Sequence, residues 1–281
     1  MNILVTGANG QLGSEFIGHN IIRITRKDID FFNDTDLEIT KKISSYKFDV
    51  LINCAAFTNV SGSSYHRHEN ELVNSSSVDI MSRVCENKKA LFIQISTDYV
   101  FKGGALGLRV EDDKCFPVNH YGTEKYNAEV ATWQNCSKYY ILRVASLFGG
   151  KNNFVNSIIR KSDKMAILEV VNDQLMSPTY TKDVRDAIYK LIKINPEYGT
   201  YHMNNTGSTS WYEFAKEISK CRAFDSEIVP ILLKDYQEMM DDDTKMPMNT
   251  ALSNYKLEKV GIKMRHWKDA LADYLYNTTF I

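Results

Sequence analysis

Tyr121 and Lys125, four residues apart, are the side chains in this chain best suited to acid–base chemistry. On a helix, residues four apart share one face. An ammonium beside a phenol favours the phenolate and lowers the phenol pKa from its usual value of about 10. Such a pair can deliver a proton to a carbonyl oxygen while a hydride reaches the carbon. The spacing therefore predicts Tyr121 as a proton donor and Lys125 as its partner.

Thr97 is the third candidate catalytic residue. It lies in the string Ser96-Thr97-Asp98-Tyr99, directly after the apolar run 90–95, which we predict to be a buried strand. In open parallel sheets, ligands bind outside the carboxyl ends of the strands. This position predicts that the Thr97 hydroxyl lies beside the reacting carbonyl. The alternative is a strand-end residue that bonds local backbone.

A glycine-rich loop at Gly7, Gly10 and Gly13 follows the first apolar run, 3–5. In dinucleotide-binding loops the first glycine permits a tight turn, the second lets backbone approach a pyrophosphate, and the third allows close packing. The following segment, 11–19, is predicted to be helical and to face the phosphates with its N-terminus. The alternative is a glycine-rich turn without a ligand.

The end of the second apolar run, 21–24, carries Thr25, Arg26 and Lys27. Many NAD enzymes place an acid here to bond the ribose 2′-OH. A basic pair instead suits a 2′-phosphate, because a guanidinium matches phosphate geometry. We therefore expect NADPH as the preferred cofactor, with NADH as the alternative and Asp30 near the adenine. If the cofactor were NADH, Arg26 and Lys27 would be ordinary solvated charges.

Strand and helix patterns alternate over the first half of the chain. Apolar runs at 49–53 and 139–144 join those at 3–5, 21–24 and 90–95, and helical patterns at 37–46, 70–86 and 121–133 lie between them. This rhythm is typical of an α/β fold with a Rossmann-like, doubly wound parallel sheet. We expect residues 1–150 to form the dinucleotide-binding domain, with 172–205 returning to it. Residues 151–171 and 206–281 are expected to form a smaller substrate-binding lobe.

The later elements are expected to be a mixture of helices and short strands. Helices are predicted at 153–161, 181–194, 210–220 and 267–276, and extended segments at 166–171 and 199–203. Ser210 is expected to cap the third of these helices, with Glu213 completing a capping box. The acidic segment 227–245 is expected to be rich in loops.

Composition limits the class of protein. The 281 residues carry a formal net charge of −1, which gives no long-range attraction for nucleic acid or an anionic membrane. No apolar stretch is long enough to span a bilayer, and the segment from Met1 is predicted to be a strand rather than a signal peptide. Five scattered cysteines without a CxxC pair predict reduced thiols and a cytoplasmic protein.

Taken together, these segments resemble the dTDP-4-dehydrorhamnose reductase family of extended short-chain dehydrogenase/reductases. The resemblance covers nearly the whole chain, in the family's order. It is carried by the segments 5–15, 52–58, 96–101, 121–125, 141–143, 152–155, 173–174, 177–179 and 210–215.

The resemblance implies roles for individual residues. Tyr121 would donate the proton, Lys125 would anchor the ribose, and Thr97 would complete the catalytic set. The implied cofactor contacts are Gly7, Asn9, Gly10, Gln11, Leu12, Arg26, Asp30, Ala55, Ala56, Thr58, Ser96, Tyr121 and Lys125. The implied substrate contacts are Val60, Tyr99, Ser146, Asn153 and Phe154. No metal site is expected; Glu15 matches an acid that some members use at a magnesium-linked dimer contact.

Three departures from the family pattern fall where a substrate would lie. Ser146 stands where the family usually has tryptophan, which removes a flat apolar wall. The polar and basic loop 61–68 replaces a charged run. Met246-Pro247 replaces an Arg-Pro pair, with Lys245 as a candidate substitute for the arginine.

The resemblance implies an NADPH-dependent reductase of a 4-keto-6-deoxy nucleotide sugar, acting in deoxysugar or surface-polysaccharide biosynthesis. Two alternatives stay open: an NADP-binding regulatory subunit without catalysis, and a nucleotide-sugar epimerase. A 3,5-epimerase side activity would need an extra acid–base pair, for which Cys115, His120 and His66 are candidates. A dehydratase is disfavoured because Tyr99 stands where dehydratases carry glutamate. A homodimer is an assembly that the family admits.

Overall fold

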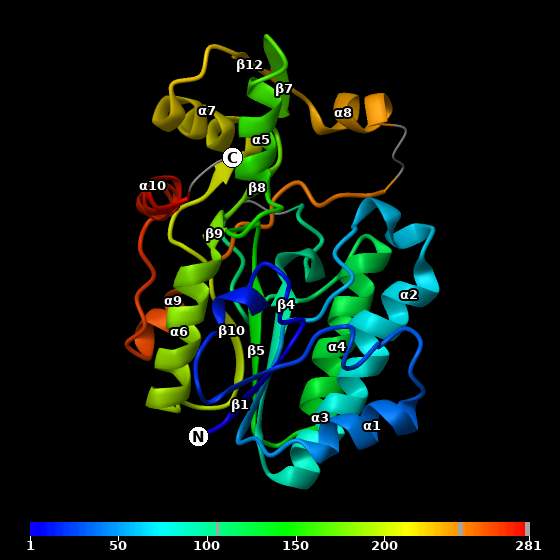
Figure 1. The fold of residues 1–281 in the computed structure, drawn as a ribbon. Coiled ribbons are helices and arrows are strands. Elements are labelled where there is room, and N and C mark those ends of the chain that lie inside the picture. The colour runs from blue at the N-terminus through cyan, green and yellow to red at the C-terminus, as the bar shows by residue number, and fades with distance from the viewer. Residues whose placement is uncertain (105–106, 241–243, 279–281) are drawn as a thin grey trace.

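A six-stranded parallel sheet forms the centre of the computed structural model, which describes residues 1–104, 107–240 and 244–278 (Figure 1). The strand order is β10-β5-β4-β3-β1-β2. The bounds are β1 Ile3–Thr6, β2 Ile21–Arg23, β3 Val50–Asn53, β4 Leu91–Thr97, β5 Tyr139–Val144 and β10 Gly199–His202. The direction of winding reverses between β1 and β3, which is where such sheets bind ligands. The predicted fold class is confirmed.

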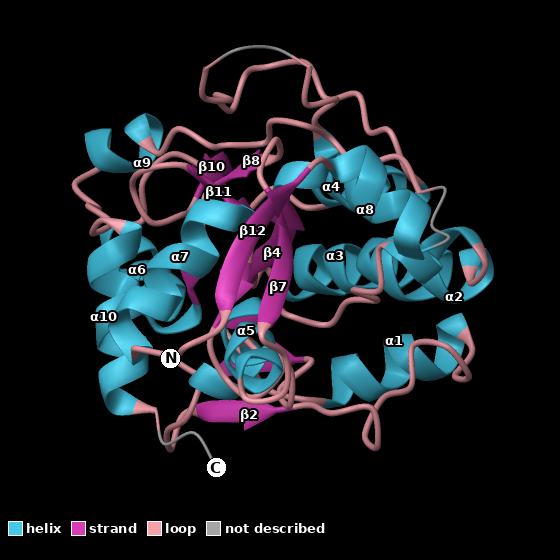
Figure 2. Ribbon diagram, turned by 90° about the horizontal axis from the view of Figure 1, so that it is seen from above, coloured by secondary structure: helices cyan, strands magenta, loops and turns pink. Residues whose placement is uncertain are grey.

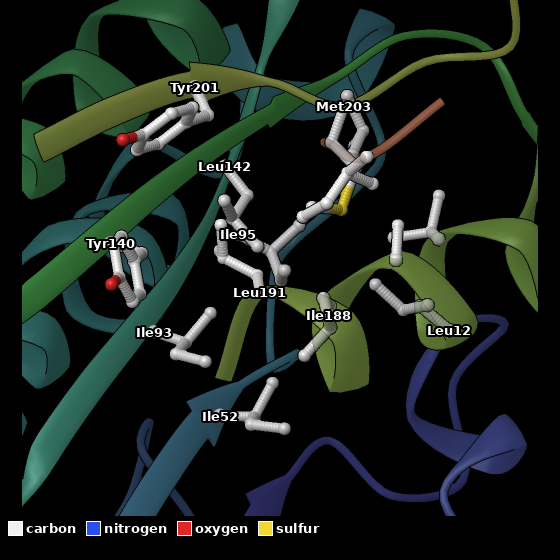
Figure 3. Close-up of a cluster of buried hydrophobic side chains, with 14 of the residues drawn as sticks. Leu12, Ile52, Ile93, Ile95, Tyr140, Leu142, Ile188, Leu191, Tyr201 and Met203 are labelled. Carbon is white, nitrogen blue, oxygen red and sulfur yellow. The ribbon is translucent and has the colours of Figure 1, made fainter. Parts of the chain in front are cut away.

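Helices cover both faces of this sheet. On one face lie α1 (Asp36–Ser45), α3 (Ser77–Lys88) and α4 (His120–Asn135), and on the other lies α6 (Thr181–Ile194) (Figure 1). Figure 3 shows the core on the α6 side, where Ile188 and Leu191 of the helix face Ile52, Ile95 and Leu142 of the strands. These side chains are almost fully buried, because a parallel sheet must be covered on both sides.

A smaller lobe sits above the carboxyl ends of the strands (Figures 1 and 2). It contains α5 (Phe154–Ser162), β7 (Ile167–Val171), α7 (Trp211–Arg222), β12 (Glu227–Ile231), α8 (Leu233–Met240) and α10 (Trp267–Asn277). Two short strand pairs connect it to the sheet: β6 (Leu147–Phe148) with β9 (Thr179–Tyr180), and β8 (Leu175–Met176) with β11 (Thr209–Ser210). No helix within the described ranges is long and apolar enough to cross a membrane.

The boundary between the parts is less simple than the sequence indicated. Strand β10, which lies within the segment 172–205, pairs with β5 in the large sheet. The segment after it also returns in part: α9 (Tyr255–Lys259) supplies Leu257, and Ile262 and Met264 follow, all buried in the core of the large sheet. Much of 250–264 therefore packs on the dinucleotide-binding half.

The predicted helix at 11–19 is wrong. Only a short 3-10 turn, Gly13–Glu15, forms there. Gly10, Gly13 and Gly18 lower the helix propensity of this segment. Phe16 turns fully into the core, and its carbonyl accepts a hydrogen bond from Arg23 Nη1 at 2.7 Å rather than from a helical N–H. The loop therefore presents no long helix N-terminus to an anion.

The predicted helix at 70–86 is interrupted. It divides into α2 (Arg67–Glu71), a π-helical turn (Leu72–Ser76) and α3. The wide turn places Asn74 so that its amide accepts from Phe57 N at 3.0 Å and donates to Phe57 O at 2.9 Å. This side chain clamps the loop after β3.

The segment 227–245 is more regular than predicted. It contains β12 and α8, because Glu227–Ile231 pairs in parallel with Ile167–Val171; residues 241–243 lie outside the described ranges. Ser210 caps α7 as expected, accepting from Glu213 N at 3.1 Å. The Glu213 carboxylate lies 3.7 Å from Lys216 Nζ instead of completing a capping box.

Candidate active site

Two adjoining cavities open at the carboxyl ends of β1, β3 and β4. The larger has a volume of about 780 Å³ and the smaller about 360 Å³. Of the residues predicted from sequence, the larger is lined by Asn9, Gly10, Gln11, Leu12, Ala55, Ala56, Thr58, Ser96, Thr97, Tyr121, Lys125 and Ser146. The smaller is lined by Gly7, Asn9, Gly10, Arg26, Asp30, Ala55 and Ala56. The structure thus brings most of the predicted site together.

The glycine loop packs so tightly that side chains are excluded from it. Gly7 has φ of +62°, and a Cβ there would lie 2.5 Å from Ala55 N. A Cβ on Gly13 would lie 2.2 Å from Gly7 O. Backbone therefore lines the cavity where a dinucleotide pyrophosphate would lie, and the residues present fit such a cofactor.

The smaller cavity has a cation at its rim. Arg26 Nε lies 3.1 Å from Asp30 Oδ2, and the Arg26 side chain is 73% exposed. Burial is the largest single influence on the Asp30 pKa and raises it. The bonds from Asn33 Nδ2 and Phe32 N and the charge of Arg26 together outweigh burial and lower that pKa. Asp30 thereby holds Arg26 beside the cavity, whereas Lys27 does not line it. The geometry fits an adenine ribose carrying an anionic group.

Thr97 interacts with both Tyr121 and Asp98. Thr97 Oγ1 donates to Asp98 Oδ1 at 3.0 Å, and Asp98 also accepts from the hydroxyl of Thr250. The Thr97 hydroxyl oxygen also accepts from Tyr99 N at 3.2 Å, and the interaction of the Thr97 hydroxyl with Tyr121 favours the phenolate. Burial raises the pKa of Asp98 to about 6 and that of Tyr121 to about 12. The expected lowering of the Tyr121 pKa by Lys125 is thus wrong for this structure, because desolvation dominates.

Lys125 is held by a relay of buried polar groups. Its Nζ donates to Ile95 O at 2.7 Å, and the same carbonyl accepts from Gln94 Nε2 at 2.8 Å. Gln94 accepts in turn from Asn53 Nδ2 at 2.8 Å. Burial lowers the pKa of Lys125 to about 8, with Glu129 opposing the shift. The side chain is therefore still largely protonated at pH 7 and fixed at the end of β4.

Behind the cavity, Glu129 connects the candidate site to a buried arginine. Ser96 Oγ donates to Glu129 Oε1 at 2.5 Å, and Arg143 donates to both Glu129 oxygens at 2.7 and 2.9 Å. Arg143 also lies 3.4 Å from His202 Nε2, while His202 Nδ1 faces Ser253 O at 3.1 Å. Burial lowers the pKa of His202 to about 3, so this imidazole is neutral. The bonds between Glu129 of α4 and Arg143 of β5 hold this helix and this strand together.

The residues expected to contact substrate are only partly gathered. Ser146 lines the larger cavity with φ of +44°, an uncommon conformation for a residue other than glycine. The Tyr99 ring meets that of Tyr121 edge-on at 5.9 Å, and burial raises the Tyr99 pKa. Val60, Tyr99, Asn153 and Phe154 line neither cavity. Asn153 caps α5, and Phe154 packs 4.6 Å from the Trp211 ring.

Glu15 and the epimerase candidates have other partners. Glu15 accepts from Thr181 Oγ1 at 2.7 Å and lies 3.6 Å from Arg185 Nη1. Among the described residues, no three His, Cys, Asp or Glu side chains gather in a way that could hold a metal. Cys115 accepts from Arg143 at 3.1 Å. His120 lines a separate polar cavity, and His66 Nδ1 lies 3.6 Å from Glu69 Oε1. Neither histidine lines the two cavities described above.

Sequence reasoning missed several lining residues. In the larger cavity they are Ser14, Asn53, Cys54, Ile95, Val144, Leu147, Gly150, Lys151 and Asn152. Asn53 and Cys54 end a strand and could have been found by the rule that ligands bind at carboxyl ends. The glycine pair before Lys151 was the available signal for the loop 149–152. The aromatic residues Phe31, Phe32 and Phe57 of the smaller cavity carried no spacing signal.

Comparison with known proteins agrees with this geometry. The model of the family described as "RmlD substrate binding domain" matches residues 1–280. The spore coat polysaccharide biosynthesis protein SpsK of Bacillus subtilis is 33% identical over 280 residues, covering 97% of this chain and 96% of its own.

Two solved structures are similar over nearly their full length. A dTDP-4-dehydrorhamnose reductase from Clostridium acetobutylicum is 35% identical with a TM-score of 0.92, covering 98% of this chain and 99% of its own. The reductase of the same name from Bacillus anthracis, in complex with NADP, is 30% identical with a TM-score of 0.92 and covers 99% of each chain. This chain therefore belongs to the RmlD family, that of the dTDP-4-dehydrorhamnose reductases.

Proposed function

We propose that this protein is an NADPH-dependent reductase of a nucleotide-linked 4-keto-6-deoxy sugar, of the dTDP-4-dehydrorhamnose type. One observation carries the proposal: Thr97, Tyr121 and Lys125 line the same cavity as the glycine loop. A dinucleotide on that loop and a carbonyl beside Tyr121 would occupy one continuous space. The names of the relatives supply the substrate class.

Backbone and one arginine would hold the cofactor. The residues from Gly7 to Leu12 would face the pyrophosphate, and Arg26 would pair with a 2′-phosphate. The NADP complex of the Bacillus anthracis relative supports this assignment. When bound, NADPH supplies the hydride.

The chain's own residues supply the proton. With a pKa raised to about 12, Tyr121 carries its proton throughout the neutral range, as a donor to a reduced carbonyl oxygen must. The Thr97 hydroxyl interacts with that of Tyr121, and both residues line the cavity. Lys125, on the same helix, provides a fixed positive charge and a donor for a ribose hydroxyl. Asp98 keeps Thr97 oriented through its bond with the hydroxyl hydrogen.

The departures from the family pattern concern the sugar. Ser146 lines the cavity with a small side chain in place of the family's tryptophan, so this wall leaves room for a bulkier sugar. Pro247 O accepts from Gln174 Nε2 at 2.9 Å, and Lys245 lies in a separate polar cavity. We propose that the substrate differs in its sugar, while the reduction at C4 is kept.

The test is oxidation of NADPH by a panel of dTDP- and UDP-linked 4-keto-6-deoxy sugars, with stereochemistry of the products determined by NMR. The expected result is turnover with at least one sugar of the panel. Tight binding of NADPH without turnover of any sugar would overturn the enzyme assignment in favour of a regulatory subunit. Product inverted at C3 or C5 would favour the epimerase.

We also propose that the protein is cytoplasmic and forms a homodimer. All five cysteines are free, which fits a reducing cytoplasm. A homodimer is proposed from the family alone. Light scattering of the purified protein decides between a monomer and a dimer.

A further inference from the structure

The loop of residues 149–152 joins β6 to α5 and has all of its first three carbonyls tied to the smaller lobe. Gly149 O accepts from Asn153 Nδ2 at 3.1 Å. Gly150 O accepts from Asn156 Nδ2 at 3.0 Å and from Tyr274 Oη at 2.9 Å. The carbonyl of the next residue, Lys151, accepts from Asn156 Nδ2 at 2.9 Å. Side chains of α5 and α10 thus hold one side of the loop.

The other side of the loop consists of N–H groups. In a trans peptide the carbonyl and the following N–H point in opposite directions, and the described chain contains no cis peptide. The N–H groups of Gly150, Lys151 and Asn152 therefore point away from α5 and α10. None of the three donates to an acceptor in the parts of the chain that the structure describes. Successive N–H groups around a residue with positive φ, here Gly150 at +62°, form a concavity for anions.

These same three residues line the larger cavity. Asn152 O accepts from Gln11 Nε2 at 2.6 Å, which places the loop in direct contact with the glycine loop. Lys151 is exposed, so its flexible side chain is available to a ligand in the cavity that it lines. Two backbone loops and the residue Lys151 therefore border the same space.

We propose that the loop 149–152 is a second anion-binding element that grips the diphosphate of the nicotinamide dinucleotide through the amides of residues 150–152 and the ammonium of Lys151. The proposal rests on the proposed use of NADPH, and it adds a cofactor contact from outside the glycine loop. The diphosphate of a nucleotide sugar has the same chemistry, so the two sources must be separated by experiment.

The experiment uses Lys151→Met and measures cofactor binding by fluorescence titration without any sugar. The dissociation constants of NADPH and NADH should both rise about tenfold, because an ammonium–phosphate bond is lost from a group common to both. The dissociation constant of ADP-ribose, which contains the diphosphate, should rise to the same degree. Adenosine 2′-monophosphate, which lacks it, should bind as before. Lys164→Met, on the exposed turn after α5, is the matched control and should change nothing.

Tyr274→Phe is the second variant. It removes the hydroxyl that bonds Gly150 O and the loop-holding side chains Asn153 and Asn156, and Tyr274 does not line the cavity. It should weaken both dinucleotides about two- to fivefold, with a native circular dichroism spectrum. Unchanged dissociation constants in Lys151→Met, with a raised KM for the nucleotide sugar only, would overturn the proposal and assign the loop to the substrate. Unchanged dissociation constants and an unchanged KM in both variants would also overturn the proposal. Because no sugar is present in the titrations, a failure to find turnover would leave this result standing.

Discussion

The Tyr121 hydroxyl is the group on which the proposed chemistry depends. Tyr121→Phe removes the proton donor and leaves the ring in place against Tyr99. We expect kcat to fall by about 10²–10⁴, the usual contribution of a positioned acid. The dissociation constant of NADPH should stay within about tenfold, because few cofactor contacts are lost. An equally large loss of NADPH affinity would show that Tyr121 serves binding rather than proton transfer.

Arg26 is the residue that should distinguish the two nicotinamide cofactors. Its guanidinium lies at the rim of the smaller cavity, oriented by Asp30 at 3.1 Å. We expect Arg26→Ala to raise the dissociation constant of NADPH at least about tenfold and to leave that of NADH nearly unchanged, because only NADPH carries a 2′-phosphate. Lys27→Ala, outside the cavity, is the control. An unchanged ratio in Arg26→Ala would contradict the assignment.

At the scale of elements, the end of β4 carries a titratable group that shapes the site. Burial raises the pKa of Asp98 to about 6, and the carboxylate accepts from Thr97 and Thr250. As pH falls through about 6, Asp98 takes up a proton and can no longer accept from both hydroxyls. We therefore expect kcat to fall on the acid side of a pH profile, with a midpoint near pH 6.

The Asp98→Asn variant tests whether Asp98 causes the fall of kcat at acid pH. An amide cannot titrate, so the acid limb should disappear and leave a lower, flatter profile. The Asp28→Asn variant, on an exposed turn, should keep the acid limb. If the acid limb persists in Asp98→Asn, another group controls it.

Elements with a clear period could be predicted from the sequence, and those determined by distant partners could not. Helix α6 spans Thr181–Ile194, as its apolar period predicted. The helix predicted at 11–19 does not form, because Phe16 is fully buried and its carbonyl accepts from Arg23. No local sequence pattern shows that contact. The π-helical turn at Leu72–Ser76 was not predicted for the same reason, because it depends on the bond between Asn74 and the distant backbone of Phe57.

The candidate site follows the same division. The spacing of Tyr121, Lys125 and the glycines allowed them to be predicted from the sequence, and Gly10, Tyr121 and Lys125 line one cavity. The loop 149–152 was missed because its amides are turned to the cavity by Asn156 and by Tyr274, more than a hundred residues later in the chain. The direction of the Tyr121 pKa was also missed, because burial cannot be read from a spacing of four residues.

For the whole molecule, the two parts of the chain are mutually dependent. Strand β10 covers the edge of β5, α6 covers one face of the sheet, and Leu257 completes its core. We expect a fragment of residues 1–150 to remain unfolded, because it would expose that face and edge to water. Circular dichroism and chemical-shift dispersion are the measurements, with the full chain as control. A cooperative unfolding transition in the fragment would contradict this expectation.

The position of β10 at the edge of the sheet also bears on how the protein is made. The sheet cannot be completed until Gly199–His202 has left the ribosome, although β1 to β5 emerge within the first 144 residues. During that interval the nascent chain displays an unpaired β5 and an uncovered apolar face, which are surfaces that chaperones recognise and that aggregate when crowded.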